Sequence, residues 1–213
     1  MIYKQPSLSL PPLYHITGLL PSGGSHTELV SLLAAGGATW IQVRDKRPPD
    51  AELLAAVSEA AALARARNVT LLVNDWLDVA LAAGAAGVHL GQDDLSVEEA
   101  RRRFPGGIIG LSTHNLRQAD AAGRLPVDYI AIGPIFRTAT KTENAPLGLE
   151  VLRQVRRSVS RPLVAIGGIT PENALLAWEA GADSVAVISD IIGSGDPAGR
   201  TALYFSLWKQ FRA

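Results

Sequence analysis

The sequence predicts a single-domain (β/α)8 barrel (TIM barrel), an α/β fold in which parallel strands alternate with helices. Short apolar runs rich in β-branched residues recur along the chain, and longer segments with helical spacing lie between them. We count eight such strand-then-helix units in 213 residues. Regular alternation of this kind demands a parallel sheet, and the count of eight favours a closed barrel over an open doubly wound sheet.

Eight short apolar segments supply the predicted strands. They are Leu13–Thr17, Trp40–Val43, Thr70–Val73, Gly87–Leu90, Ile108–Leu111, Asp128–Ile132, Leu163–Ile166 and Ser184–Val187. Residues 1–12 form an irregular N-terminal extension in this scheme, and residues 13–213 form the barrel.

The predicted helices are recognised by apolar residues three and four positions apart. They include Ala51–Arg67, Glu150–Ser158, Glu172–Ala180 and a last, aromatic helix over Pro197–Phe211. Thr170 precedes Pro171, which is the arrangement of an N-cap followed by Pro in the first turn. The aromatic residues of the last helix fit either a seal on the barrel or a contact between copies in a homo-oligomer.

Composition excludes several functional classes. Twenty basic residues balance twenty acidic ones, so net charge gives no reason to expect nucleic acid or a membrane surface as partner. Cysteine is absent, which excludes disulfides, thiolate metal sites and a cysteine nucleophile. The N-terminal residues lack the apolar run of a signal peptide, and we expect a cytoplasmic protein.

The barrel prediction directs attention to the carboxyl ends of the strands, where such folds carry their chemistry. Gln42, Arg44 and Lys46 follow the second strand and alternate, so they project to one side. An amide and two cations at a barrel mouth suit a polar heterocycle that carries phosphates. The alternative is an exposed strand end with ordinary salt bridges.

Carboxylates follow the third and fourth strands. Asn74-Asp75 ends one, and Asp93-Asp94 lies just beyond the other. Asp75 and Asp94 together are typical of a Mg²⁺ site completed by substrate phosphate and water. Each could instead cap a helix, but Ser96 can cap the helix after Asp94 and leave Asp94 free. Asp93 is the more natural bystander of the pair.

The sixth strand ends in Gly133-Pro134, and the loop that follows carries Thr138, Thr140 and Lys141. Proline cannot continue a strand ladder. Two hydroxyls and an ammonium in the loop can hold an anion such as phosphate, whereas the alternative is a solvated polar loop.

Three further strand ends carry polar or glycine-rich sequence. Ser112 follows the fifth strand, Gly167-Gly168 the seventh and Ser189 the eighth. Exposed backbone N–H groups near the last two strands of a barrel commonly bind phosphate. His89 lies within a strand and is expected to be a core histidine, the alternative being a polar contact in the barrel mouth.

These residues in this order resemble the thiamine-phosphate synthase family. The matching strings are Gln42–Lys46, Asn74-Asp75, His89–Asp94, Gly110–His114, Gly133–Lys141, Val164–Ile169 and Val187–Ser189.

The resemblance implies a (β/α)8 barrel that couples 4-amino-5-hydroxymethyl-2-methylpyrimidine diphosphate to 4-methyl-5-(2-phosphoethyl)thiazole, giving thiamine phosphate and diphosphate. It implies that Mg²⁺ binds at Asp75 and Asp94. The residues implied to hold the pyrimidine diphosphate are Gln42, Arg44, Lys46, Asn74, Ser112 and Lys141. Those implied to hold the thiazole phosphate are Thr138, Thr140, Gly168, Ile188 and Ser189. The implied catalytic residues are Arg44, Lys46, Lys141 and Ser112.

Two departures from the family pattern stand out. Arg137 replaces a Pro that is common before the Thr-x-Thr-Lys string, and Trp76 follows Asn-Asp where a polar residue is frequent. A thiazole tautomerase-like paralogue is the nearest alternative. It would carry a His directly after the sixth-strand Gly, where this chain has Pro134. A non-catalytic thiamine phosphate binder is a second alternative, and retention of both Asp75 and Asp94 argues against it.

Overall fold

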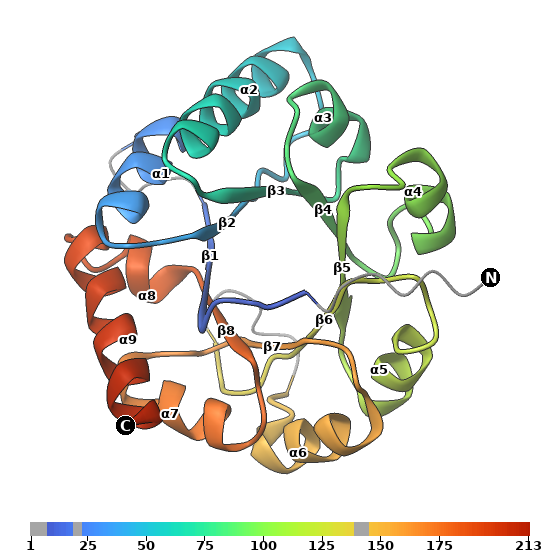
Figure 1. Ribbon diagram of the computed structural model, residues 1–213, viewed down its shortest axis with the longest axis vertical. Helices are drawn as coiled ribbons and strands as arrows, with labels where there is room; N and C mark the ends of the chain where they lie inside the picture. The colour runs from blue at the N-terminus through green and yellow to red at the C-terminus, as the bar shows by residue number, and fades with distance from the viewer. Residues whose placement is uncertain (1–7, 19–22, 139–144) are drawn as a thin grey trace.

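The computed structural model is a closed barrel of eight parallel strands, β1 to β8 in sequence order, enclosed by helices (Figure 1). The structure describes residues 8–18, 23–138 and 145–213. The strands are β1 (Leu13–Ile16), β2 (Trp40–Val43), β3 (Thr70–Asn74), β4 (Gly87–Leu90), β5 (Ile108–Thr113), β6 (Tyr129–Ile132), β7 (Leu163–Ile166) and β8 (Ser184–Val187). The predicted (β/α)8 fold is confirmed.

Helices follow each strand and form the outer layer of the barrel (Figure 1). They are α1 (His26–Ala35), α2 (Ala51–Ala66), α3 (Leu77–Ala82), α4 (Val97–Arg103), α5 (Leu116–Ala122), α6 (Gly148–Ser158), α7 (Pro171–Glu179), α8 (Ser189–Ile192) and α9 (Pro197–Arg212). Among them α8 was not predicted, because four residues are too few to show helical periodicity.

Strands β3 and β5 extend beyond their predicted ends, and the extension concerns the site. Asn74 pairs with His89, and Ser112 pairs with Ala131 in the sheet register. Both polar residues follow apolar runs, so the apolar pattern alone ends each strand too early. Their side chains therefore project from the sheet itself and not from a loop.

Aromatic rings fill the lower interior of the barrel. Tyr14, Trp40 and Tyr129 pack edge to face in pairs, with ring centroids 5.8 to 6.2 Å apart. Gly110 makes room for this cluster, since a Cβ at that position would lie 2.0 Å from Cζ of Tyr129. The interior is thus solid below the site, as in other barrels of this kind.

The main hydrophobic core lies between the strands and the helices. Leu29 of α1, Leu53 of α2 and Ile109 and Ile130 of the sheet are buried in it. In the described part of the chain, no helix is long and apolar enough to span a membrane.

Helix capping follows the sequence closely. Ser96 caps α4, accepting the Glu99 N–H at 3.2 Å, and Thr170 and Asn173 form a capping box at α7. Ser96 thus takes the cap position predicted for it, which leaves Asp94 outside the helix end.

Candidate active site

The carboxyl ends of the strands enclose a cavity of about 480 Å³. Side chains and backbone from every strand end contribute to its wall. The predicted site residues that line it are Gln42, Arg44, Lys46, Asn74, Asp75, Asp94, Ser112, Thr138, Gly168, Ile188 and Ser189. Predicted residues Thr140 and Lys141 lie outside the described residues.

The two cations after β2 are tied to neighbouring strand ends, Arg44 through its backbone and Lys46 through its side chain. The Arg44 N–H donates to Thr17 Oγ1 at 3.1 Å, which ties the β2 end to the β1 end. Lys46 Nζ donates to Asp75 Oδ2 at 2.5 Å, so this ammonium lies over the β3 end. Both side chains line the cavity and place positive charge at one side of its mouth.

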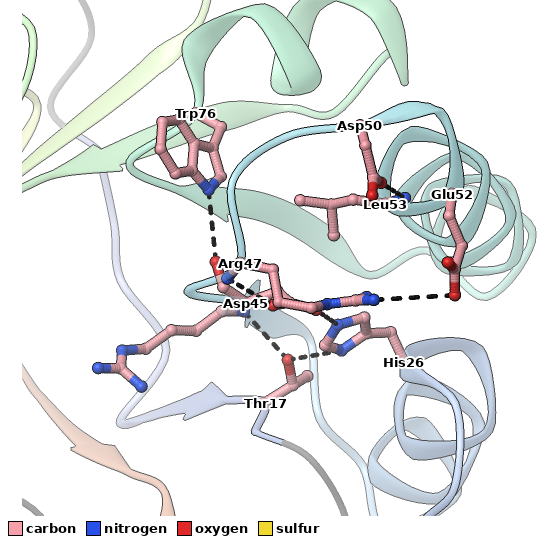
Figure 2. Close-up of polar contacts among 9 residues, drawn as sticks. Thr17, His26, Asp45, Arg47, Asp50, Glu52, Leu53 and Trp76 are labelled. Atoms are coloured by element: carbon pink, nitrogen blue, oxygen red, sulfur yellow. Dashed lines mark hydrogen bonds and ion pairs between the residues drawn. The ribbon is translucent and has the colours of Figure 1, made fainter.

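Asp45, between these cations, faces away into a buried polar network (Figure 2). Its carboxylate accepts hydrogen bonds from the Arg47 backbone N–H and guanidinium at 2.9 to 3.2 Å. His26 Nε2 lies 3.5 Å from the same carboxylate, and the other His26 nitrogen lies 3.2 Å from Thr17 Oγ1. The network thus joins Thr17, the partner of the Arg44 N–H, to Asp45.

The pKa of the Asp45 carboxyl depends on both its burial and its hydrogen bonds. Burial alone would raise it, but the hydrogen bonds from Arg47 and His26 outweigh burial, so the pKa is lowered. Trp76 adds a further support, since its indole Nε1 donates to the Asp45 carbonyl at 3.4 Å. Trp76 thus supports the loop after β2.

Asp75 and Asp94 meet beside Lys46, just beyond the ends of β3 and β4. Asp94 is not free, because its Oδ2 accepts the Gly91 N–H at 2.6 Å. Burial raises the pKa of the Asp94 carboxyl, and the neighbouring Asp75 raises it further against the Gly91 hydrogen bond. Two carboxylates this close repel each other unless a proton or a cation lies between them.

The backbone at Asp75 is in the left-handed region, with φ of 64°. Asp tolerates this region better than most residues, yet such a conformation costs of order 1 kcal/mol and concentrates at functional sites. The conformation follows directly after β3, where the chain turns towards α3. It orients the carboxylate beside Asp94 and under Lys46.

A cation fits the chemistry of this donor set. Carboxylate oxygens are the ligands that Mg²⁺ prefers, and Mg²⁺ commonly takes only one or two from the protein and the rest from substrate phosphates and water. No group of three or more His, Cys, Asp or Glu that could hold a metal occurs among the described residues. Asp75 and Asp94 are thus a partial site that an anionic substrate would complete.

Asn74 carries an unsatisfied donor. The residue is only 6% exposed, and its Nδ2 has no hydrogen-bond partner among residues 8–18, 23–138 and 145–213. A buried amide without a partner is costly, and such groups point to a missing ligand or water. Because Asn74 lines the cavity, a ligand acceptor there would satisfy it.

A buried hydrogen-bonded chain crosses the floor of the cavity. Gln42 Nε2 donates to the Tyr14 hydroxyl at 2.7 Å, and this hydroxyl lies 2.8 Å from that of Tyr129. The Tyr129 hydroxyl lies 2.7 Å from His89 Nδ1, and His89 Nε2 lies 2.8 Å from Ser112 Oγ. Five strands thus contribute one member each, and both ends line the cavity.

The members of this chain are uncharged at neutral pH. Burial raises the pKa of Tyr14 to about 12 and that of Tyr129 well above its ordinary value. Burial lowers the pKa of His89 to about 4, with Lys46 adding to this and Asp94 opposing it. His89 is therefore a neutral imidazole that donates from one nitrogen and accepts at the other. It is both a core histidine and a cavity residue.

The loops after β6 and β7 are in close contact at the other side of the cavity. Gly168 has φ of 65°, and a Cβ there would lie 2.3 Å from the Arg137 carbonyl oxygen. Phe136 N–H donates to the Gly167 carbonyl at 2.9 Å. The glycines therefore allow residues 136–137 to lie against the end of β7. Thr138 and Ser189, the first residue of α8, both line the cavity. Arg137 itself is exposed.

Sequence reasoning missed several cavity residues. Gln92 Nε2 donates to the Ser112 carbonyl at 2.6 Å, and His114 Nδ1 lies 3.0 Å from the Gly133 carbonyl. Gln118 of α5 accepts the His114 N–H at 2.7 Å and also lines the cavity. All three fall within or near strings already singled out, but which way their side chains point depends on loop conformation.

A second hollow, of about 890 Å³, lies at the amino ends of β1, β7 and β8. Its aromatic wall comes from Trp178, Trp208 and Phe211, whose rings contact one another. The last helix thus packs its aromatic residues against Trp178 of α7. This end is remote from the polar strand ends.

Comparison with known proteins agrees with this geometry. The sequence model of the thiamine monophosphate synthase family matches residues 13–191. The chain is 48% identical to the Methanoculleus marisnigri thiamine-phosphate synthase over 187 residues, covering 86% of this chain and 89% of that protein. It is 47% identical to the Koribacter versatilis thiamine-phosphate synthase over 209 residues, covering 94% and 97%.

A solved structure is similar as well. The thiamine phosphate pyrophosphorylase from Pyrococcus furiosus superposes with a TM-score of 0.85 at 36% identity, covering 94% of this chain and 96% of that one. The family match spans all eight strands and every strand end that lines the cavity. This chain belongs to the thiamine monophosphate synthase family.

Proposed function

We propose that this chain is a thiamine-phosphate synthase. It couples 4-amino-5-hydroxymethyl-2-methylpyrimidine diphosphate to 4-methyl-5-(2-phosphoethyl)thiazole and releases diphosphate. Family membership supports the activity. The observation that carries the proposal is one cavity mouth where Arg44 and Lys46 lie beside the paired carboxylates Asp75 and Asp94.

The diphosphate end of the first substrate is assigned to this mouth. Arg44 and Lys46 would contact its oxygens, joined by Lys141 from the loop after β6. The described lining also carries Asp75, Asp93 and Asp94, so the carboxylates there outnumber the two Arg and Lys cations. A diphosphate would be repelled by that balance, which supports a bound divalent cation.

Asp75 and Asp94 would hold Mg²⁺. The ion would neutralise charge that builds up on the departing diphosphate. The Lys46 ammonium bonded to Asp75 occupies the same neighbourhood, and it is free to swing because its side chain is 57% exposed. We therefore assign Lys46 to the diphosphate once the carboxylates hold the metal.

The pyrimidine ring is assigned to the cavity floor. Gln42, Asn74 and Ser112 supply the polar groups there, and the unpaired Nδ2 of Asn74 would donate to an acceptor on the ligand. The thiazole phosphate is assigned to the β6–β8 side. Its predicted contacts are Thr138, Thr140, Gly168, Ile188 and Ser189.

The chain's own groups stabilise and align the reactants and need not move a proton. The bond between the pyrimidine methylene carbon and the diphosphate oxygen breaks, and both electrons leave with the diphosphate. The thiazole nitrogen lone pair then forms the new bond to that carbon. Arg44, Lys46 and Lys141 stabilise the leaving group, and the two anion sites hold the reacting atoms in line.

The test is a coupling assay with the purified chain, both substrates and Mg²⁺. Thiamine phosphate and diphosphate should appear in equal amounts, and omission of the thiazole phosphate should abolish the first product. Thiamine phosphate binding without turnover would contradict the proposal and favour the non-catalytic binder. Cytoplasmic location and the choice between monomer and homo-oligomer stay predictions.

A further inference from the structure

The hydrogen bonds on the cavity floor form one continuous chain of five residues. Its members, Gln42, Tyr14, Tyr129, His89 and Ser112, are joined by contacts of 2.7 to 2.8 Å. Each Tyr hydroxyl has one proton, and the neutral imidazole has one N–H. If each of these four contacts is to be a hydrogen bond with one proton in it, each inner member must accept from one neighbour and donate to the other.

This condition leaves two arrangements. In the first, the Gln42 amide donates to Tyr14, and the direction continues through Tyr129 and His89 until His89 Nε2–H donates to Ser112. In the second, every bond is reversed and the Gln42 carbonyl accepts from Tyr14. The structure has Gln42 Nε2 towards Tyr14, which is the first arrangement.

The donor or acceptor character of one end of the hydrogen-bonded chain therefore fixes that of the other end. In the first arrangement Gln42 turns its carbonyl oxygen, an acceptor, away from the chain. Ser112 already accepts from His89, so its own proton is left for a ligand. Both residues line the cavity, which thus presents an acceptor at one end of the chain and a donor at the other.

We propose that these linked hydrogen bonds make the cavity bind an amino-substituted pyrimidine in preference to its oxo counterpart. Tyr14, Tyr129 and His89 are positioning residues in this proposal. The inference rests on the proposed placement of the pyrimidine between Gln42 and Ser112. An exocyclic amine donates and the adjacent ring nitrogen accepts, which matches the two ends. In the oxo form the ring nitrogen carries a proton and the oxygen accepts, so both ends are mismatched.

The oxo form can be matched only by a concerted reversal. The Gln42 amide must turn, the imidazole must change tautomer, and the hydroxyl protons must move together. A site built to pair with polar groups of one polarity rejects the wrong polarity strongly, because its own buried groups are left unpaired. If one inner hydroxyl is removed, Gln42 and Ser112 can each exchange donor for acceptor independently of the other.

The test compares the binding of non-hydrolysable phosphonate analogues of the amino- and oxo-pyrimidine diphosphates, with Mg²⁺ and without thiazole phosphate. We expect the wild-type chain to favour the amino form by about 100-fold or more in Kd. Tyr129→Phe removes the central hydroxyl, and the preference should fall to about tenfold or less. Tyr14→Phe cuts the same chain at another link and should act alike, which keeps the test open if one variant fails to fold.

Tyr204→Phe is the matched control. Tyr204 is also a buried tyrosine, but its hydroxyl bonds Asp190 of α8 and lies outside the chain. It should leave the amino-to-oxo preference at its wild-type value. An unchanged preference in both Tyr129→Phe and Tyr14→Phe would overturn the proposal.

A second readout does not depend on ligand affinity. Nitrogen-15 shifts of the His89 imidazole should show protonated Nε2 and bare Nδ1 in the wild-type chain, and a protonated Nδ1 would overturn the proposed direction. The coupling assay separates this inference from the proposed function. If the protein makes thiamine phosphate but His89 has the wrong tautomer, only this inference is refuted. If the protein does not couple the substrates but shows the expected tautomer and amino-to-oxo preference, only the proposed function is refuted.

Discussion

Asp45→Asn tests whether the network behind the β2 cations positions them. The substitution keeps shape and removes charge from a side chain that is 6% exposed. Asn retains one acceptor oxygen, so part of the bonding to the Arg47 N–H survives, but the guanidinium and His26 contacts are weakened. A hydrogen bond to a charged group contributes about 1.5 to 3 kcal/mol.

The expected loss is smaller than that full value. The Arg47 side chain is 49% exposed and water can replace part of its contact. We expect the free energy of unfolding to fall by about 1.5 kcal/mol. For a domain of this length that corresponds to a decrease in Tm of about 3 to 6 °C.

The kinetic effect is expected in substrate binding and alignment. Thr17 contacts both His26 and the Arg44 N–H, so disturbance of Asp45 reaches the backbone of Arg44. A misplacement of about 1 Å at such a position can cost about 100-fold in rate. We expect kcat/KM for the pyrimidine diphosphate to fall about tenfold, with KM for the thiazole phosphate unchanged.

Glu52→Gln is the matched control, because Glu52 approaches the same guanidinium from outside at 3.7 Å. Its side chain is 81% exposed, so Tm and kinetics should stay within error. Steady-state kinetics and thermal unfolding of both variants make the comparison. If Asp45→Asn lowers Tm but leaves KM for both substrates and kcat unchanged, the network is structural only and the positioning argument is wrong.

The pH dependence of stability gives the same experiment a second check. The folded-state pKa of Asp45 is lowered, so its stabilising effect is complete above the unfolded-state value, 3.8, and is lost as pH falls through the lower folded-state value. The stability gap between wild type and Asp45→Asn should therefore be full at neutral pH. It should begin to close below about pH 4 and be lost only as pH falls through the lower folded-state pKa.

Three further predictions concern other parts of the site. Asp75→Asn should raise the Mg²⁺ concentration needed for half-maximal rate by about tenfold, measured by metal titration of the coupling assay, and an unchanged titration would remove Asp75 from the metal site. Lys141→Ala should lower kcat by about 100-fold with little change in Tm, and near-normal turnover would exclude it from leaving-group stabilisation. Gly110→Ala should give little folded protein by circular dichroism, since its Cβ would lie 2.0 Å from Cζ of Tyr129, whereas exposed Gly106→Ala, with nothing within 4 Å, should fold normally.

Much of the fold was predictable because strands and helices produce local patterns of apolar residues in the sequence. Apolar runs and helical spacing located all eight strands, and the barrel prediction then directed attention to Gln42, Asn74, Asp75 and Ser112. Strand ends were less accurate, because polar Asn74 and Ser112 continue the ladder through pairing with neighbouring strands. That pairing is a tertiary effect with no local signature.

The supporting network was harder to predict for the same reason. Asp45 lies between two predicted cations, yet its partner His26 is 19 residues away and on another element. The alternation of side chains along β2 places Asp45 opposite its neighbours but does not say what it meets. Gly168 was singled out for its bare N–H group, whereas the structure shows an additional cause, the close approach of the Arg137 carbonyl.

The structural supports of the two proposed anion sites explain how one barrel mouth can bind two anionic substrates at separate positions. The backbone of Arg44 is supported by the β1–α1 side, through Thr17 and His26, and Asp45, between Arg44 and Lys46, contacts the same His26. Gly167 and Gly168 instead join the β6 and β7 ends, on the far side of the mouth. Each proposed anion site thus has its own rigid support, and the hydrogen-bonded floor from Gln42 to Ser112 lies between them. Separate supports allow one site to change in affinity while the reacting atoms stay aligned by the other, which is why Asp45→Asn should affect the pyrimidine substrate alone.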